Sequence, residues 1–299
     1  MKRFLKTALL LSAALALPAA LITPAWAKTK SPFTPRGVRP QGMGNAFVAV
    51  AGDINSIYWN PAGLALIKRG ESQLMIEHQD LYGFGVDENY VAFAQNKFGF
   101  SWRHTGVGAD FLFGADWSEN VFTLSYAHQM DPQLYAGASL KYLKQTFKAP
   151  TDATTKGSSA MDVNGDGYAA DVGFLYVVSK DTTAGVAVRD IFGEAEAEGI
   201  PGGYKDRYEP IVSFGFSRTP SENIIHSFQL DHVAEEWRVS LGVEYKLQRE
   251  IILRAGLEDE VITAGLGLMY EDWEIDYSFK NKPSQGLDKT QRFGAIVRF

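Results

Sequence analysis

The sequence predicts an all-β fold, a transmembrane antiparallel β-barrel of about fourteen strands with an N-terminal plug (hatch) segment. Three observations lead to this prediction. From residue 72 onward, bulky apolar residues alternate with small or polar ones, the period of a β-strand. The small face is rich in glycine, and the chain begins with an export signal.

Composition narrows the chemistry that the protein can perform. None of its 299 residues is a cysteine, which rules out disulfides, thiolate metal sites, cysteine nucleophiles and a lipid-modified cysteine. The formal net charge is -6, and the sequence contains no stripe of basic residues. Nucleic-acid binding is therefore not expected, because phosphate contacts need clustered positive charge.

Residues 1–27 resemble a signal peptide. Lys2, Arg3 and Lys6 precede an apolar run over 7–17, and residues 25–27 form a small-x-small cleavage motif. A permanent membrane anchor is the alternative, but Pro18 and the cleavage motif favour removal. Beyond this segment no apolar run reaches the roughly 20 residues that a membrane-spanning helix needs. Any crossing of a membrane would then have to be made by a barrel.

The alternation is regular enough to count strands. In the strand over 237–247, Trp237 and Leu241 share one face while Arg238 and Gly242 share the other. The last strand repeats the pattern and ends on Phe299, which we interpret as a C-terminal assembly signal. About fourteen such runs occur, an even number within the range of bacterial outer-membrane barrels.

A soluble β-sandwich would also alternate, so the composition of the two faces has to decide. One face carries Trp, Tyr, Phe, Leu and Val, and the other carries Ser, charges and many glycines. Glycine on the outside of a sandwich would only weaken its strands, whereas inside a barrel it leaves room for a plug or ligand. The barrel is therefore favoured, with these glycines facing inward: Gly137, Gly173, Gly185, Gly215, Gly242, Gly256, Gly265, Gly267 and Gly294.

Loop lengths give a second argument for the barrel. Short connections are expected at 96–97, 130–132, 179–181, 219–222, 248–250 and 271–272, and longer ones at 79–88, 105–116, 149–165, 191–207 and 281–287. Short turns on one rim and long loops on the other are typical of outer-membrane barrels, with the short turns in the periplasm. Both barrel ends would then be periplasmic, with the barrel spanning 71–299.

The parity of the alternation predicts strand register. A two-residue turn at Glu271 and Asp272 fits the change of outward positions from even to odd. The preceding turn needs an odd number of residues, centred near Arg249. That register sets Glu244 directly across from Arg254, and we predict an ion pair between them; two solvated charges that never meet are the alternative.

Residues 28–70 do not alternate and form the predicted plug. Three prolines at 32, 35 and 40 suggest an extended linker, and residues 46–51 are compatible with a helix. Asp53 could cap a second short helix through Tyr58, which Pro61 and Gly63 would end. A compact segment of this size suits the interior of a wide barrel. A periplasmic arm is the alternative.

Two runs in this segment carry a family resemblance. RPQGMGNAFVAVAGD over residues 39–53 and NSIYWNPAGL over 55–64 resemble the N-terminal signature of FadL-type fatty-acid transporters and the PorV/PorQ group. The resemblance implies a short member of that group, with a plug inside the barrel and no cofactor. It assigns the hatch motif to Gly42, Gly44, Asn45, Asn60, Pro61, Ala62 and Gly63.

Other chemistry is weakly signalled. Asp162, Asn164 and Asp166 resemble the start of a calcium loop, but Gly173 stands where a bidentate acid is needed, so we interpret the stretch as a polar external loop that turns into a strand. The five histidines are scattered, and neither a Gly-x-Ser-x-Gly nor a His-Glu-x-x-His motif occurs. An enzyme is not predicted, although a Ser–His pair between neighbouring strands stays open.

The expected function is diffusive uptake of hydrophobic or amphipathic, fatty-acid-like small molecules across the outer membrane. The alternative is a PorV-like secretion or surface-attachment component that binds exported proteins. Expected partners are outer-membrane lipid, the hydrophobic ligand and the barrel assembly machinery. Inward charges would line the path or, as we prefer, pair with the plug, and inward apolar residues would pack the plug or hold ligand. The lumen candidates are Phe93, Arg103, Leu175, Arg238, Glu244, Arg254, Met269, Asp276 and Arg292.

Overall fold

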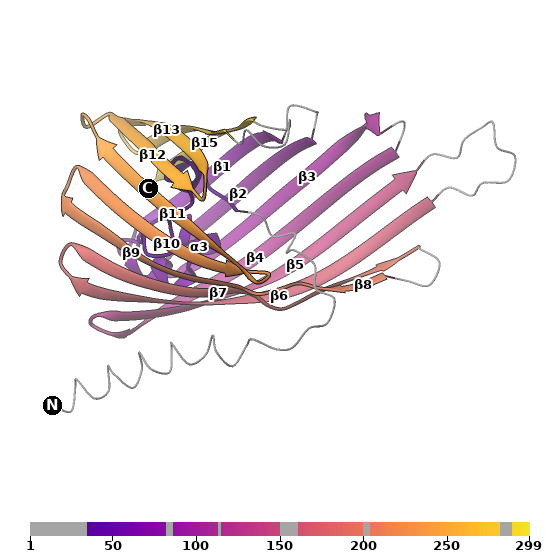
Figure 1. The fold of residues 1–299 in the computed structure, drawn as a ribbon, viewed down its shortest axis with the longest axis horizontal. Coiled ribbons are helices and arrows are strands. Elements are labelled where there is room, and N and C mark those ends of the chain that lie inside the picture. Colours follow the sequence, from indigo (N-terminus) through magenta and orange to yellow (C-terminus); the bar gives the residue numbers. More distant parts are fainter. Residues whose placement is uncertain (1–34, 82–85, 113–114, 150–160, 200–203, 282–288) are drawn as a thin grey trace, which may run out of the picture.

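The computed structural model describes residues 35–81, 86–112, 115–149, 161–199, 204–281 and 289–299. In this part of the chain, antiparallel strands curl into a barrel around a short N-terminal segment (Figure 1). No helix among these residues is both long and apolar enough to cross a membrane.

The wall is built from β-strands that follow one another along the chain. They are β1 (Ser72–Leu81), β2 (Val86–Gln95), β3 (Phe98–Leu112), β4 (Ala115–Asp131), β5 (Leu134–Ala149), β6 (Met161–Ser179), β7 (Thr182–Glu198), β8 (Tyr204–Arg207), β9 (Ile211–Ser221), β10 (Ile224–Val233), β11 (Glu236–Lys246), β12 (Ile251–Glu258), β13 (Val261–Tyr270), β14 (Trp273–Asn281) and β15 (Lys289–Arg298).

Neighbouring strands pair antiparallel, and the pairing of β1 with β15 closes the barrel. β8 and β9 both pair with β7, one after the other, so together they occupy a single position in the wall. The result is a closed barrel of fourteen strands, which confirms the predicted fold class and strand number.

The two predicted turns and the register between them are confirmed. Tyr270 pairs with Trp273 across a two-residue turn. Lys246 pairs with Ile252, and Glu244 pairs with Arg254 as the parity argument requires. The odd or even numbering of the outward positions is enough to predict the register, because a one-residue slip would turn every side chain of a strand to the other face.

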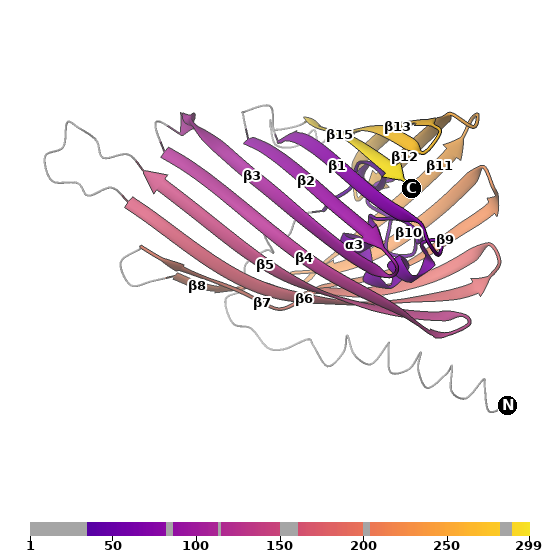
Figure 2. The ribbon, with the colours of Figure 1, turned by 180° about the vertical axis from the view of Figure 1, so that it is seen from behind.

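The height of the wall is uneven. β3 to β7 contain 15 to 19 residues, whereas β10 to β15 contain 8 to 11. About 9 to 11 residues are enough for a strand to cross a membrane. Figures 1 and 2 show the long strands extending past the short ones on one side of the barrel.

This extension corrects the predicted loop boundaries. Strand pairing continues into regions that the sequence predicts to be long loops, at 105–116, 149–165 and 191–207. The reason is that polar side chains occupy the outer face of these strand ends, which made them look like loops. Residues 150–160, 200–203 and 282–288 lie outside the described part of the chain.

The bulky face of the strands lies outside and the small face inside. Along β5, Leu140 is 68% exposed on the outer face while its neighbour Ser139 is 1% exposed. On β3 to β6, the aromatic side chains of Trp102, Phe122, Tyr142 and Tyr168 are direct register partners. They form one outward row, which we call the aromatic row.

The N-terminal segment, residues 35–70, contains α2 (Val38–Gly42), α3 (Ser56–Trp59) and the 3-10 helix η1 (Pro61–Leu66). The helix expected at 46–51 is wrong, because this stretch forms turns whose amides bond to the wall. Pro40 lies inside α2 rather than in an extended linker. The second predicted helix exists, but its N-cap is Asn55 and not Asp53. The Asp53 carboxylate instead accepts a hydrogen bond from the Asn55 amide just before the helix.

Candidate functional site

The N-terminal segment lies against nine inward-facing glycines, which we call the glycine belt. They are Gly99, Gly137, Gly173, Gly185, Gly215, Gly242, Gly256, Gly265 and Gly294. A Cβ atom added at any of them would meet atoms of this segment at 3.1 Å or less. Real Cβ atoms avoid contacts this short, so the belt makes room for the segment.

The belt is aligned across neighbouring strands. Gly137 pairs with Gly173, and Gly242 pairs with Gly256. Side chains at the first pair would collide with Asn60, Pro61 and the backbone of the next residue, and at the second with the backbone of residues 43 and 44. The aligned glycines thus bring the backbone of the segment directly onto the backbone of the wall.

Polar contacts between the segment and the wall satisfy its irregular backbone. The Asn60 Nδ2 atom donates to the carbonyls of Val48 and Phe174 at 2.8 and 3.0 Å. Gln229 Oε1 accepts hydrogen bonds from two successive backbone amides of the segment, at residues 47 and 48. A segment with little secondary structure needs such partners, because buried unpaired amides are costly.

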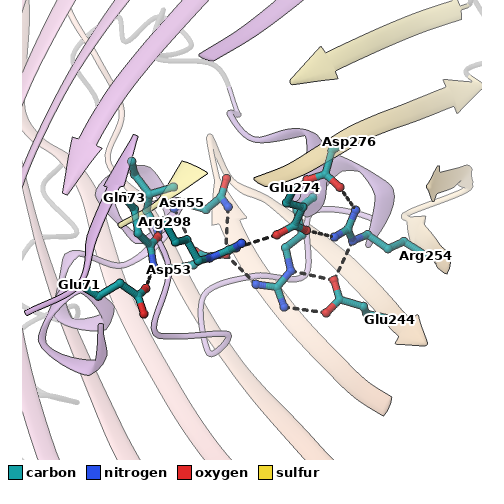
Figure 3. Close-up of polar contacts among 11 residues, drawn as sticks. Asp53, Asn55, Glu71, Gln73, Glu244, Arg254, Glu274, Asp276 and Arg298 are labelled. Atoms are coloured by element: carbon teal, nitrogen blue, oxygen red, sulfur yellow. Dashed lines mark hydrogen bonds and ion pairs between the residues drawn. The ribbon is translucent and has the colours of Figure 1, made fainter. Parts of the chain in front are cut away.

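A buried ion-pair network joins the segment to β11, β12, β14 and β15 (Figure 3). Arg254, 0% exposed in its side chain, contacts Glu244 at 2.7 Å, Glu274 at 2.6 Å and Asp276 at 2.5 Å. Arg39 of the segment reaches the same Glu244 carboxylate at 2.7 Å. The predicted pair of Glu244 with Arg254 is therefore real and belongs to a larger network.

Arg39 also bonds to a carboxylate of its own segment. Its Nη1 atom lies 2.7 Å from Asp53 Oδ2. Burial disfavours the charge on Arg39, but Glu244 and Asp53 outweigh that effect, and the pKa of Arg39 lies above its ordinary value. The guanidinium is thus a permanent cation that ties the segment to the wall.

A second network lies on the β1, β2, β3, β4 and β15 side. Arg36 pairs with Glu88, and Arg103 pairs with Glu119. Arg292 donates to the carbonyls of Gly37 and Pro35 at 3.3 and 3.2 Å. Inward charges therefore pair with the segment and with one another, the interpretation that we preferred from the sequence.

A third cluster was not predicted. Lys141 on β5 lies 2.8 Å from both Asp171 and Asp190, all of them nearly fully buried. The arrangement depends on a bulge in β7, where Asp190 adopts a positive φ of 61°. Lys141 could have been found from its place on the small face of 134–149, but no sequence signal marks the bulge.

Tyr58 lies between the second network and the Lys141 cluster, which we together call the charged layer. The guanidinium of Arg189 stacks over the Tyr58 ring at 4.9 Å, and Lys141 lies 5.6 Å from the same ring. Burial raises the pKa of Tyr58 above its ordinary value, so its phenol stays neutral.

Little open space remains in this layer. A cavity of about 20 Å³, room for one water, is lined by polar side chains that include Arg103 and Lys141, by the Tyr58 ring and by apolar Ile57 and Val121. Around this cavity, the N-terminal segment packs against the glycine belt and occupies the described interior at this level.

Beyond the charged layer, toward the β3–β4 and β5–β6 connections, the inner face of the long strands becomes largely apolar. We use "above" for this direction. Val107, Trp117, Phe147 and Val163 form one register row across β3 to β6. Nearer the charged layer lies a buried cluster of Val121, Leu143, Ala169, Ala195 and Tyr208. A polar row that includes Glu119 and Gln145 runs between them. We call these residues together the upper inner wall.

The outer face of the same strand ends shows the opposite polarity. Beyond the aromatic row, β5 carries Lys144, Thr146 and Lys148 outward, and β6 carries Asp162, Asn164 and Asp166 outward. Below the row, β5 presents Leu140 outward and Ser139 inward. Past the aromatic row, the outer face of these strands thus changes from apolar to polar, while the inner face changes from polar to largely apolar. We call this the exchange of polarity.

The structure places the predicted hatch residues inside the barrel. Gly44 has a positive φ of 62°, and its amide donates to Thr263 Oγ1 at 2.9 Å. Asn45 donates to Glu258 at 2.7 Å. Gly42, Asn60, Pro61, Ala62 and Gly63 are all buried.

Most of the lumen candidates face inward. Arg103, Leu175, Glu244, Arg254, Asp276 and Arg292 are buried there, and Arg238 and Met269 are half-buried nearer the rims. Phe93 is wrong: it is 38% exposed on the outer face, between inward Ala92 and Ala94. The inward positions of β2 include Tyr90 and two alanines. Because each face of β2 carries a bulky side chain, the difference in bulk is too small to show which face points inward.

The predicted polar loop at 162–167 is also wrong. Asp162, Asn164 and Asp166 lie on β6 in regular pairing with β5, alternating with inward residues. An extended strand does not wrap its side chains around one point, as a calcium loop does. Over the described residues, no three His, Asp or Glu side chains gather as a metal site.

Phe299 closes the seam of the barrel. Its backbone amide donates to the Ser72 carbonyl at 3.0 Å, and its own carbonyl accepts from Ser72 at 2.7 Å. Its side chain is 66% exposed. A role as an assembly signal stays a prediction.

The fold is that of the FadL-type outer-membrane transporters. The toluene transporter TbuX of Ralstonia pickettii is similar with a TM-score of 0.59 at 15% identity, over 89% of this chain and 98% of the other. A FadL homologue of Pseudomonas aeruginosa has a TM-score of 0.59 at 11% identity, over 88% and 98%.

The Pseudomonas putida toluene transporter TodX has a TM-score of 0.56 at 12% identity, over 91% of this chain and 98% of the other. No protein-family model matches the chain, and no curated protein is significantly similar in sequence. At these identities the likeness establishes the fold.

Proposed function

We propose that the protein lies in a bacterial outer membrane and mediates diffusive uptake of hydrophobic or amphipathic small molecules. The exchange of polarity across the aromatic row is the observation that carries this proposal. Below the row, an apolar exterior suits lipid, while above it a charged exterior suits water and an apolar interior suits a greasy ligand.

The direction of uptake follows from the two rims. Aromatic residues at membrane interfaces mark the boundary of the lipid, so the aromatic row is placed at the outer surface and the extended wall outside the cell. The short turns and both barrel ends are then periplasmic. Residues 1–27 would be the export signal, removed before assembly.

The upper inner wall is the proposed site of first binding. Its apolar rows would hold the body of the ligand, and the polar row with Glu119 and Gln145 would accommodate one polar group. Two of the proteins with the same fold are toluene transporters, which supports a small ligand with an apolar body.

The N-terminal segment is proposed to act as a plug, because the charged layer leaves room for only one water. Passage of a ligand then requires part of the segment to move. Residues 60–64 are the proposed moving part, since they lie against Gly137 and Gly173 on the wall nearest the upper inner wall. Most wall charges that pair with the segment contact residues 35–53, which would stay in place.

Uptake of labelled toluene and of a medium-chain fatty acid by cells producing the protein tests the proposal. Phe147→Asp places a charge on the upper inner wall and is expected to lower uptake about tenfold or more, because burial of an aromatic side chain against ligand is worth more than 1 kcal/mol. Thr146→Asp, the neighbour on the outer face, is the matched control and should leave uptake unchanged.

Unchanged uptake in Phe147→Asp, with the barrel folded, would contradict the proposed site. Equal uptake in cells with and without the protein would contradict the function itself. The secretion-component alternative predicts instead that the protein co-purifies with large exported proteins, and it stays a prediction.

A further inference from the structure

A hollow lies in the outer face of the barrel over β9 to β12. It has a volume of about 690 Å³ and is open to the outside, and its walls are formed mainly by Phe216, Phe228, Leu241, Val243, Ala255 and Leu257. This size falls within the range of small-molecule pockets, roughly 300 to 1,000 Å³. We call it the outer groove.

The outer groove is distinct from the barrel interior. Behind it, Gly242 and Gly256 face inward, and Met43 and Gly44 of the N-terminal segment lie directly against them. The interior is filled at this level, so the open volume lies on the side where lipid would stand.

A row of small side chains explains the hollow. Val243 on β11 pairs with Ala255 on β12, which pairs with Ala264 on β13. The adjacent register row is larger, with Leu241 opposite Leu257. The small row therefore lies lower than its surroundings and leaves a depression in the apolar surface.

One end of the outer groove carries a guanidinium and an imidazole side chain. Arg218 on β9 and His226 on β10 are direct register partners on the outer face, a few residues from the short β9–β10 turn, and Thr182 of β7 lies opposite Arg218. The Arg218 Nε atom donates to Asp181 at 3.3 Å. Within the described chain, neither the Arg218 Nη atoms nor the His226 ring has a hydrogen-bond partner.

An apolar groove that ends in an arginine and a histidine matches one kind of membrane molecule. An arginine fork suits the geometry of a phosphate, and a long cationic side chain near a membrane surface reaches toward the headgroups. The short-turn rim faces the periplasmic leaflet in the proposed orientation, and glycerophospholipids supply phosphates there.

We propose that the outer groove binds one glycerophospholipid, with its phosphate at Arg218 and His226 and one acyl chain along Phe228, Leu241 and Ala255. The inference rests on the proposed membrane location but not on uptake. The bound lipid would be held for longer than the surrounding lipid, because it gains charge-assisted hydrogen bonds as well as apolar contact.

Native mass spectrometry of the full chain, released by mild detergent from bilayers of phosphatidylethanolamine and phosphatidylglycerol, tests this proposal. We expect one retained phospholipid per barrel in the unaltered protein. Arg218→Ala combined with His226→Ala removes the phosphate contacts and should lower the lipid-bound fraction at least about fivefold.

Ala255→Phe, which fills the outer groove without altering Arg218 or His226, should have the same effect. Matched controls lie on the outer face away from the groove: Arg207→Ala removes a cation, and Ala138→Phe enlarges an outward alanine on β5. Both should retain the phospholipid. Loss in the controls equal to that in the groove variants would overturn the proposal, as would full retention in either groove variant.

A preparation of the unaltered protein that retains no phospholipid, or only detergent, would also overturn it. If the membrane location were wrong, the unaltered protein would not insert into the bilayers at all. This outcome distinguishes a wrong membrane location from a wrong assignment of the groove. Uptake of toluene should be the same in Ala255→Phe and the unaltered protein, which separates the groove from the proposed transport site.

Discussion

At the scale of single residues, Arg254 is a fully buried cation that holds several carboxylates of the barrel interior. It compensates three carboxylates, on β11 and β14, with none of its side chain exposed. Buried ion pairs contribute little net stability against apolar replacements, yet removing one partner leaves charges buried and unpaired. The interior is thus sensitive to the loss of this one cation.

Arg254→Met is expected to lower the free energy of unfolding by about 3 to 5 kcal/mol, because Glu244, Glu274 and Asp276 would lose their common partner. Urea unfolding of the protein in lipid vesicles, followed by tryptophan fluorescence, measures the change. Arg238→Met removes a partly exposed rim cation, paired at 3.4 Å with Glu236, and should cost less than about 1 kcal/mol. Equal losses in the two variants would contradict the account.

Residue-level outcomes also show what the sequence could predict. Glu244 and Arg254 were paired correctly because alternation and turn parity determine which residues face each other across a hairpin. Phe93 was placed wrongly because β2 has weak contrast between its faces. The contacts of Arg254 with Glu274 and Asp276 join different hairpins, and the register of one hairpin does not include them.

At the scale of elements, the N-terminal segment and the glycine belt fit each other. The segment has only two short α-helices and one 3-10 helix, so its position depends on close backbone approach and on side-chain acceptors from the wall. The sequence predicted a compact insert from the glycines of the small face. It did not predict the turns at 46–51, because bonds to distant Gln229 replace a local helix there.

Gly256→Ala is expected to displace residues 43 and 44 and to lower stability by about 1 to 3 kcal/mol, because overpacking forces the backbone to shift. Hydrogen exchange measured by mass spectrometry should show faster exchange over 38–48. Gly106→Ala on β3 is the matched control, since its nearest neighbour is the end of the His104 side chain. Protection of 38–48 that stays unchanged in Gly256→Ala would show that the belt does not hold the segment.

At the scale of the whole molecule, the barrel is a tube of membrane height with one wall extended on the long-loop side. Strand length and the aromatic row place the change of polarity at one level of β3 to β6. The extension could not be predicted from the sequence, because outward Lys, Asp and Asn on a strand resemble a polar loop. Only the pairing with neighbouring strands distinguishes the two.

The closed interior makes a prediction for the whole barrel. In planar bilayers the full chain should show no open-pore conductance, because the charged layer leaves a cavity of about 20 Å³. Removal of residues 35–66, with folding checked by resistance to protease, should produce steady conductance. A folded deletion variant that stays closed would contradict the assignment of the segment as the plug.

Spin labelling in lipid vesicles tests the central claim most directly, because the chain contains no native cysteine and single cysteines can be placed freely. A nitroxide at Leu140→Cys should collide with oxygen dissolved in lipid, while one at Thr146→Cys, on the same face of β5 beyond the aromatic row, should collide with a water-soluble nickel complex. If the label at position 140 were accessible from water, or the label at 146 lay in lipid, the proposed membrane placement and the exchange of polarity built on it would both be wrong.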